Sequence, residues 1–193
     1  MWDKRLIEKK KYVIFSVIGS HAGESEDVIF ARKKKEITDT GRSFWLINST
    51  KAKTEDIQKF CKRAHSENEE VLCMFIEPSS SRGSRPTKTS AIASKFSIDK
   101  INWEEIPKGI KITGNIKADT SALVFDELEV VERYIRIDLW NYSDFINGLG
   151  PVKTRLGGST ICAVKKFNKG MKSRYRRVIG VGRLTKPFAV WLK

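Results

Sequence analysis

The sequence predicts an α+β fold, a curved mixed sheet or a β-barrel flanked by two or three helices. Apolar runs of strand length recur about seven or eight times, whereas only two segments have clear helical periodicity, and the two kinds do not alternate as they do in a doubly wound fold. With 193 residues, 40% of them hydrophobic and 31% charged, the chain is long enough for a single domain with a substantial core.

The first predicted strand covers residues 12–18, YVIFSVI. The basic residues before it and the apolar run itself resemble a secretory signal. However, the run is only about eight residues long and is rich in β-branched residues, which favours a strand. No stretch of the sequence is long and apolar enough to span a bilayer, so we expect no membrane association.

Two helices are predicted from capping and periodicity. Ser25 can cap a helix whose first turn is acidic, which suits the helix dipole, and residues 39–41 end it. The second helix begins at Thr54 and places Ile57, Phe60, Cys61 and Ala64 on one apolar face. We expect it to pack beside the strand that precedes it, residues 43–48.

Five further strands are predicted from apolar runs or alternation: 43–48, 71–76, 109–116, 121–131 and 135–140. The near-continuous apolar run at 43–48 indicates a central strand that is covered on both faces. Residues 78–97, rich in Ser, Thr, Arg and Lys, are predicted to form a long loop that either clamps a phosphate backbone or is simply an exposed insertion.

The charge is concentrated in the last 43 residues, which hold twelve basic side chains, no acidic one, and so +12 of the formal net charge of +14. Two β-prone arms flank a turn at 168–170, which predicts a basic β-hairpin over 160–185. We expect the cations near its tip to bind phosphates: Lys165, Lys166, Lys169, Lys172, Arg174, Arg176 and Arg177. A solvated charge run is the alternative.

Signatures of catalysis are sparse. There is no P-loop and no GxGxxG motif, and neither of the two histidines has a recognisable nucleophile partner. Three scattered cysteines offer no zinc site and fit buried thiols in an intracellular protein of the nucleus or cytoplasm. The carboxylates of Asp126, Glu127 and Glu129 could serve a metal-dependent nuclease or pair with basic residues. We therefore expect no cofactor and no metal, and favour a binding protein over an enzyme.

Two segments resemble the YTH and EVE domains. Residues Arg42–Lys59, RSFWLINSTKAKTEDIQK, are similar to their opening strand and helix, and Arg177–Lys193, RVIGVGRLTKPFAVWLK, to a later pair of strands. These families belong to the PUA-like group of β-barrels, which hold flipped or modified bases in an aromatic pocket. The resemblance implies that Asn48 and Ser49 contact such a base, with Trp103 replacing the family's pocket tryptophan.

Large aromatic side chains support the same interpretation, because unstacked bases bind flat rings. Among the five tryptophans, Trp103 and Trp140 have the sequence contexts in which rings often stay partly open. The leading hypothesis is thus a nucleic-acid-binding module, for RNA or DNA, whose base pocket comprises Asn48, Ser49, Trp103 and Trp140. The alternative is a structural or assembly protein that grips nucleic acid or an acidic partner without reading bases; the nuclease ranks third.

Overall fold

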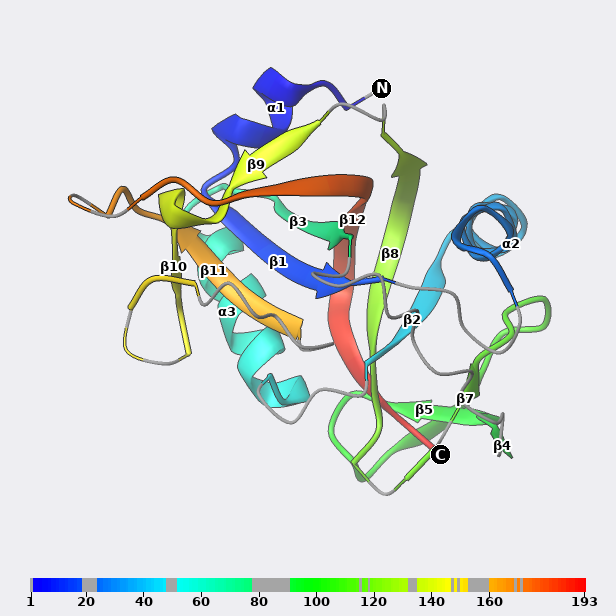
Figure 1. Cartoon of the computed structure of the whole chain (residues 1–193). Coiled ribbons are helices and arrows are strands. Elements are labelled where there is room, and N and C mark those ends of the chain that lie inside the picture. The colour runs from blue at the N-terminus through cyan, green and yellow to red at the C-terminus, as the bar shows by residue number, and fades with distance from the viewer. Residues whose placement is uncertain are drawn as a thin grey trace.

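A computed structural model describes residues 2–18, 24–47, 52–77, 91–114, 116–117, 119–131, 135–146, 148, 150–152, 160–168, 170 and 172–193. A large curved sheet forms its centre, and helices cover parts of both faces (Figure 1). The helical segments are α1 (Lys4–Lys9), α2 (Glu26–Thr40), α3 (Thr54–Ser66) and the 3-10 turn η1 (Leu139–Asn141).

The strands are β1 (Tyr12–Val17), β2 (Ser43–Ile47), β3 (Val71–Ile76), β4 (Ala91–Ile92), β5 (Lys95–Ser97), β6 (Trp103–Glu105), β7 (Thr113–Gly114), β8 (Ser121–Val130), β9 (Arg136–Asp138), β10 (Tyr142–Asp144), β11 (Thr160–Lys165) and β12 (Tyr175–Leu192). The main sheet runs in the order β10-β11-β1-β3-β12-β5-β6, with β8 and β9 also paired to β12 and β2 paired to β8. Only the β1–β3 pair is parallel among the described pairs.

The α+β class and the curved mixed sheet are therefore confirmed, and the barrel alternative is wrong. In the described part of the chain, β10 and β6 end the path and do not pair with each other. Residues 12–17, 71–76 and 121–130 form strands where they were predicted.

The predicted hairpin over 160–185 does not form. Its two arms, β11 and β12, are separated in the sheet by β1 and β3. Both arms are largely buried, and a two-stranded ribbon could not cover them on both faces. Each arm instead pairs with half of the segment 136–144: β9 lies beside the start of β12, and β10 lies beside β11.

β12 is the central strand of the sheet. Its 18 residues pair in turn with β9, β3, β8 and β5, so they reach from one end of the molecule to the other (Figure 1). Two glycines let the core close on this strand. A Cβ atom at Gly180 would lie 2.5 Å from Cζ of Phe30, and one at Gly182 would lie 2.8 Å from Cδ1 of Phe125.

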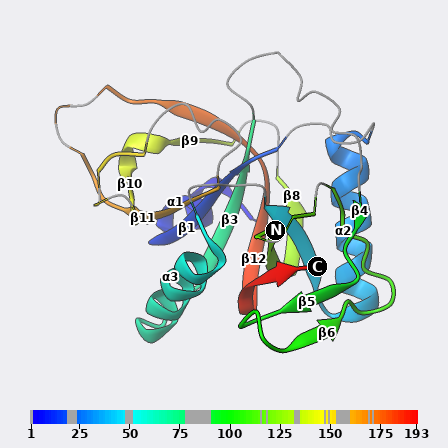
Figure 2. The ribbon, with the colours of Figure 1, turned by 90° about the horizontal axis from the view of Figure 1, so that it is seen from below.

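Two helices cover one face of the sheet at different places (Figure 2). α2 begins at its predicted cap, where Ser25 Oγ accepts from the N–H of Val28, and ends at Gly41 with φ of 77°. α3 buries the predicted face of Ile57, Phe60, Cys61 and Ala64. It packs on β12 and β3 rather than beside the preceding strand, because α2 already covers β2 and β8.

Three further expectations are corrected by long-range packing. β2 pairs only with β8 among the described strands, so it is an edge strand and not a central one. The predicted loop 78–97 contains β4 and β5, where Phe96 is buried against Phe44; residues 78–90 lie outside the described part. The predicted strands 109–116 and 135–140 shorten to β7 and β9, and the latter turns into η1 at Leu139.

Candidate nucleic-acid interface

The cations that the sequence groups together gather around one connection. Residues 166–174, here called the basic loop, join β11 to β12 and project from one side of the molecule (Figure 1). Lys165, Lys166, Lys172 and Arg174 are exposed at or in this loop, and Arg176 is half-buried just after it. Lys169, also predicted to bind phosphate, lies outside the described residues. The cations near the predicted tip thus do share one region, although no hairpin carries them.

The outgoing half of the basic loop is fixed by η1 and the residue after it. The backbone N–H of Lys166 donates to the carbonyl of Asn141 at 2.8 Å. The side chain of Asn168 donates to the carbonyls of Trp140 at 2.8 Å, of its neighbour Lys166 at 3.1 Å and of Tyr142 at 3.4 Å. These bonds fix residues 166–168, where the chain leaves the sheet.

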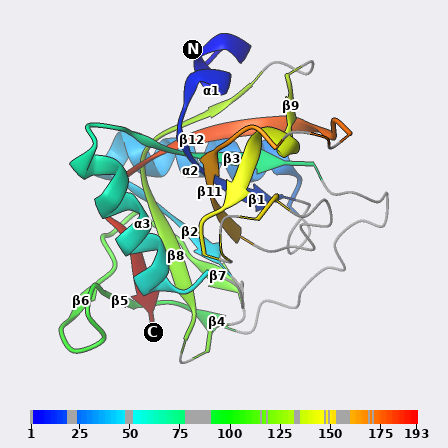
Figure 3. The same cartoon turned by 90° about the vertical axis from the view of Figure 1, so that its left-hand side faces the viewer.

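The returning half is fixed by the other end of the same turn. The backbone N–H of Arg174 donates to Oδ1 of Asp138 at 2.7 Å, and the N–H of Leu139 donates to the carbonyl of Arg174 at 3.0 Å. Asp138 Oδ1 also accepts from the N–H of Trp140 at 3.1 Å and so caps η1. Figure 3 shows η1 beside the loop. A single 3-10 turn therefore holds both ends of the basic loop.

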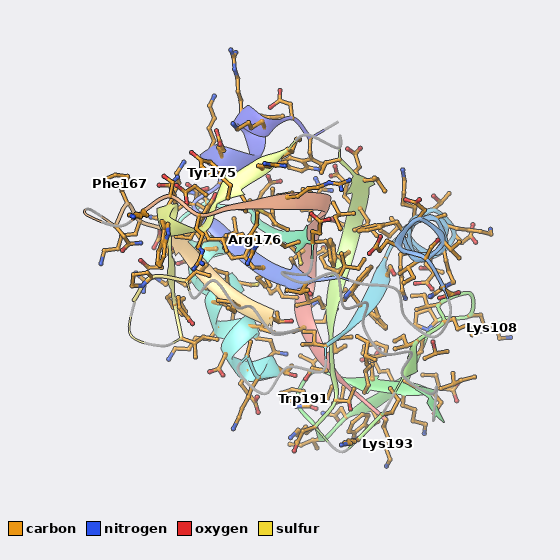
Figure 4. All side chains as sticks on the ribbon, viewed as in Figure 1. Lys108, Phe167, Tyr175, Arg176, Trp191 and Lys193 are labelled. Carbon is orange, nitrogen blue, oxygen red and sulfur yellow. The ribbon has the colours of Figure 1, made fainter. Side chains whose placement is uncertain are left out.

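Two aromatic side chains stand open among these cations, and the sequence analysis missed both. Phe167 is 74% exposed and Tyr175 is 58% exposed. Figure 4 shows Phe167 at the edge of the molecule, with Tyr175 and then Arg176 farther in, and all three away from Lys108, Trp191 and Lys193. The signal that could have found Phe167 is its position between a lysine and an Asn-Lys-Gly turn, where no neighbouring apolar residue defines a core face.

Several of the loop cations keep their charge available. Lys165, Lys166 and Lys172 form no ion pair with any carboxylate in the described ranges. Lys165 Nζ does donate to the carbonyl of Glu8 in the last turn of α1, although its side chain remains exposed. That contact also brings α1 beside the end of β11.

α1 extends the basic surface, a contribution that the sequence analysis did not identify. The N–H of Lys165 donates to the carbonyl of Lys11 at 2.8 Å, which fixes the end of α1 next to the loop. Arg5 and Lys9 on α1 are exposed and form no ion pair within the described part of the chain. Lys11 itself is neutralised by Glu67 at 2.5 Å.

Basic residues farther along β12 form ion pairs within the protein instead. Arg177 faces Glu77 at 3.8 Å. Arg183 pairs with Asp126 at 2.9 Å and Glu127 at 3.1 Å, so two carboxylates of the acidic cluster on β8 share a basic partner from the neighbouring strand, which is one of the two alternatives the sequence left open. Among the residues that the structure describes, no group of three or more His, Cys, Asp or Glu side chains could hold a metal ion.

The two tryptophans of the predicted base pocket lie apart. Trp140 lies in η1 beside the basic loop, at the β10 end of the sheet, whereas Trp103 lies in β6 at the opposite end of the strand order. Trp103 is half-buried under Lys193, whose Nζ is 5.6 Å from the ring centroid. Asn48 and Ser49 fall outside the described residues. The structure therefore brings one of the two tryptophans to the cations and not the other.

The three cysteines are unsuited to nucleophilic chemistry in this state. All three are free and buried, in the core cluster beneath α3. Burial raises the pKa of Cys61, Cys73 and Cys162 well above the usual value for a thiol, so each stays protonated near neutral pH.

Comparisons with known proteins add no homologue. No family model, curated protein or solved structure matches the chain. Membership of the PUA-like group therefore stays a prediction. Of the helices described, none is long and apolar enough to cross a membrane.

Proposed function

We propose that the protein is a nucleic-acid-binding module whose phosphate contacts come from the basic loop and its flanks. The observation that carries this proposal is the gathering of exposed cations on a loop that η1 holds at both ends. Cations that neutralise phosphates release condensed counterions, which favours binding. A backbone fixed before binding lowers the entropy that ordering would otherwise cost.

The position of the loop also supports phosphate binding. It projects from the sheet edge beside α1 (Figure 1), so an extended polyanion can contact the exposed cations of both without entering a cleft. Ion pairs elsewhere, such as Lys33 with Glu36 at 2.8 Å and Lys35 with Asp39 at 2.7 Å on α2, make that helix a weaker competitor for the same ligand.

Base reading in a pocket formed by both Trp103 and Trp140 is not part of this proposal, because the two lie at opposite ends of the strand order. The PUA-like resemblance is kept as a proposal for the two matching segments. Residues 42–59 include β2 and the start of α3, and residues 177–193 cover most of β12. β2 and β12 belong to one sheet and the start of α3 adjoins it, although this sheet is not closed into the barrel of that group.

The test is a binding series with a 12-nucleotide oligonucleotide at salt concentrations from 50 to 200 mM. Phosphate neutralisation predicts that log K falls steeply and linearly with log salt. A slope near zero would refute the proposal. An acidic partner remains the competing explanation for the cations, and polyglutamate of matched charge that binds more tightly than the oligonucleotide would favour it.

A further inference from the structure

We infer that the interface takes single-stranded nucleic acid, with Phe167 and Tyr175 stacking on unpaired bases while the neighbouring cations hold the phosphates. This inference rests on the proposed function and names its substrate class. It begins from the exposure of the two rings, 74% and 58%. Exposed aromatic rings of this size on a strongly cationic surface are the combination that single-strand binding requires, because phosphates meet the charges and base faces meet the rings.

The chain interleaves the two kinds of side chain. Lys165 and Lys166 precede Phe167, and Arg174 and Arg176 flank Tyr175. A single strand carries one phosphate and one base per nucleotide, so cations and rings that are interleaved along the chain match its two kinds of group. Two other exposed apolar side chains lie away from this loop: Ile92 is in β4 of the separate two-stranded sheet, and Ile101 is beside β6 at the other end of the main strand order. Beside the loop, Leu6 of α1 is 43% exposed next to the exposed Arg5, so apolar side chains here are interspersed with cations and do not form the contiguous patch that marks a protein interface.

The backbone that carries each ring is held in place by hydrogen bonds or by strand pairing. Phe167 sits between Lys166, whose N–H binds the carbonyl of Asn141, and Asn168, whose side chain binds the carbonyl of Trp140. Tyr175 opens β12 and pairs in register with Asp138. Asn141 and Asp138 bracket one 3-10 turn, which rises about 2 Å per residue and so separates the two anchors by about 6 Å.

That separation is of nucleotide size. One nucleotide takes up about 3.4 Å of axis in a stacked strand and more when its bases are unstacked, so the two anchors span one to two nucleotides. A duplex cannot use the rings in this way, because its bases are already stacked and paired. Single strands offer free base faces, and stacking on one ring changes affinity by about five- to 150-fold.

The experiment compares three ligands with wild type and the double variant Phe167→Ala/Tyr175→Ala. The ligands are a dT12 single strand, a 12-nucleotide abasic strand with the same phosphates, and a 12-base-pair duplex. We expect wild type to prefer dT12 over the abasic strand by at least about 25-fold, the product of the lower bound for two rings. The double variant should lose this preference and bind the abasic strand as wild type does.

Controls separate stacking from folding and from charge. Tyr175→Phe keeps the ring and should retain the preference for dT12, and because Phe167 is largely solvent-exposed, Phe167→Ala should leave the melting temperature unchanged. A wild type that is salt-sensitive but binds dT12 and the abasic strand equally would overturn the inference and leave the proposed function standing. Equal weakening of all three ligands in the double variant would also overturn it. Failure of wild type to bind any of them refutes both.

Discussion

Removing three loop cations should flatten the salt dependence of binding in a calculable way. The perturbation is the triple variant Lys166→Ala/Lys172→Ala/Arg174→Ala, in which all three substituted side chains are exposed. If these residues, Lys165 and Arg176 each contact one phosphate of a single strand, log K varies with log salt at a slope of about −3.5, or about −0.7 per phosphate. The triple variant keeps two of the five contacts, which corresponds to about −1.4.

The assay is fluorescence anisotropy with labelled dT12 between 50 and 200 mM salt. Wild type should lose about a hundredfold in affinity over this range, and the triple variant about sevenfold. The matched control is Lys34→Ala/Lys108→Ala/Lys111→Ala, which removes the same charge from exposed lysines on the α2 side of the molecule. Equal flattening in this control, or an unchanged slope in the loop variant, would refute the assignment of phosphate contacts to the basic loop.

Three further predictions follow from single side chains. Asn168→Ala removes the bonds that hold the outgoing half of the loop and should speed amide exchange there and weaken dT12 binding about fivefold, the equivalent of about 1 kcal/mol; unchanged exchange would contradict the role of this side chain. Gly180→Ala forces a Cβ atom to within 2.5 Å of the buried Phe30 ring and should cost about 1–3 kcal/mol in urea denaturation; an unchanged urea midpoint would contradict this close packing. The hydrogen bond from Lys11 lowers the pKa of Glu67 from 4.5 to about 2. The Lys11–Glu67 ion pair therefore contributes to stability above about pH 4.5, and this contribution is lost as the pH falls toward 2. Glu67→Gln should therefore lower the melting temperature at pH 7, and the difference from wild type should shrink between pH 4.5 and pH 2; a difference that does not depend on pH would exclude this ion pair as its source.

Local features of the sequence predicted individual elements well. Ser25 and Gly41 delimit α2, because an N-cap hydroxyl and a residue with positive φ act within one turn of chain. The apolar face of α3 likewise follows from the spacing of Ile57, Phe60, Cys61 and Ala64. In each case the information lies within a few residues of the feature that it specifies.

Strand partners could not be predicted in the same way. β11 and β12 each have a pattern suited to a hairpin, yet β1 and β3 lie between them. Apolar runs covered on both faces, such as β3 with all six residues buried, accept a neighbour from anywhere in the chain. The choice depends on the packing of the whole sheet, which no local pattern contains.

The candidate site was predicted in part for the same reason. Net charge is additive along the chain, so the cations around the basic loop could be found without a structure. Whether Trp103 and Trp140 lie together depends on the order of the strands in the sheet, which the sequence did not reveal. Phe167 was overlooked because the loop was interpreted by its charge alone, and α1 because its lysines adjoin the loop only through the pairing of β1 with β11.

The bonds to η1 hold the basic loop at its two described ends. Asn168 on one side and Arg174 on the other complete the bonds to the turn, and β11 and β12 are paired to their sheet neighbours before the chain reaches these residues. The stretch between positions 168 and 174 can therefore be exchanged, lengthened or replaced by a different recognition sequence at little cost to folding. The basic loop is therefore a suitable site for inserting another peptide sequence.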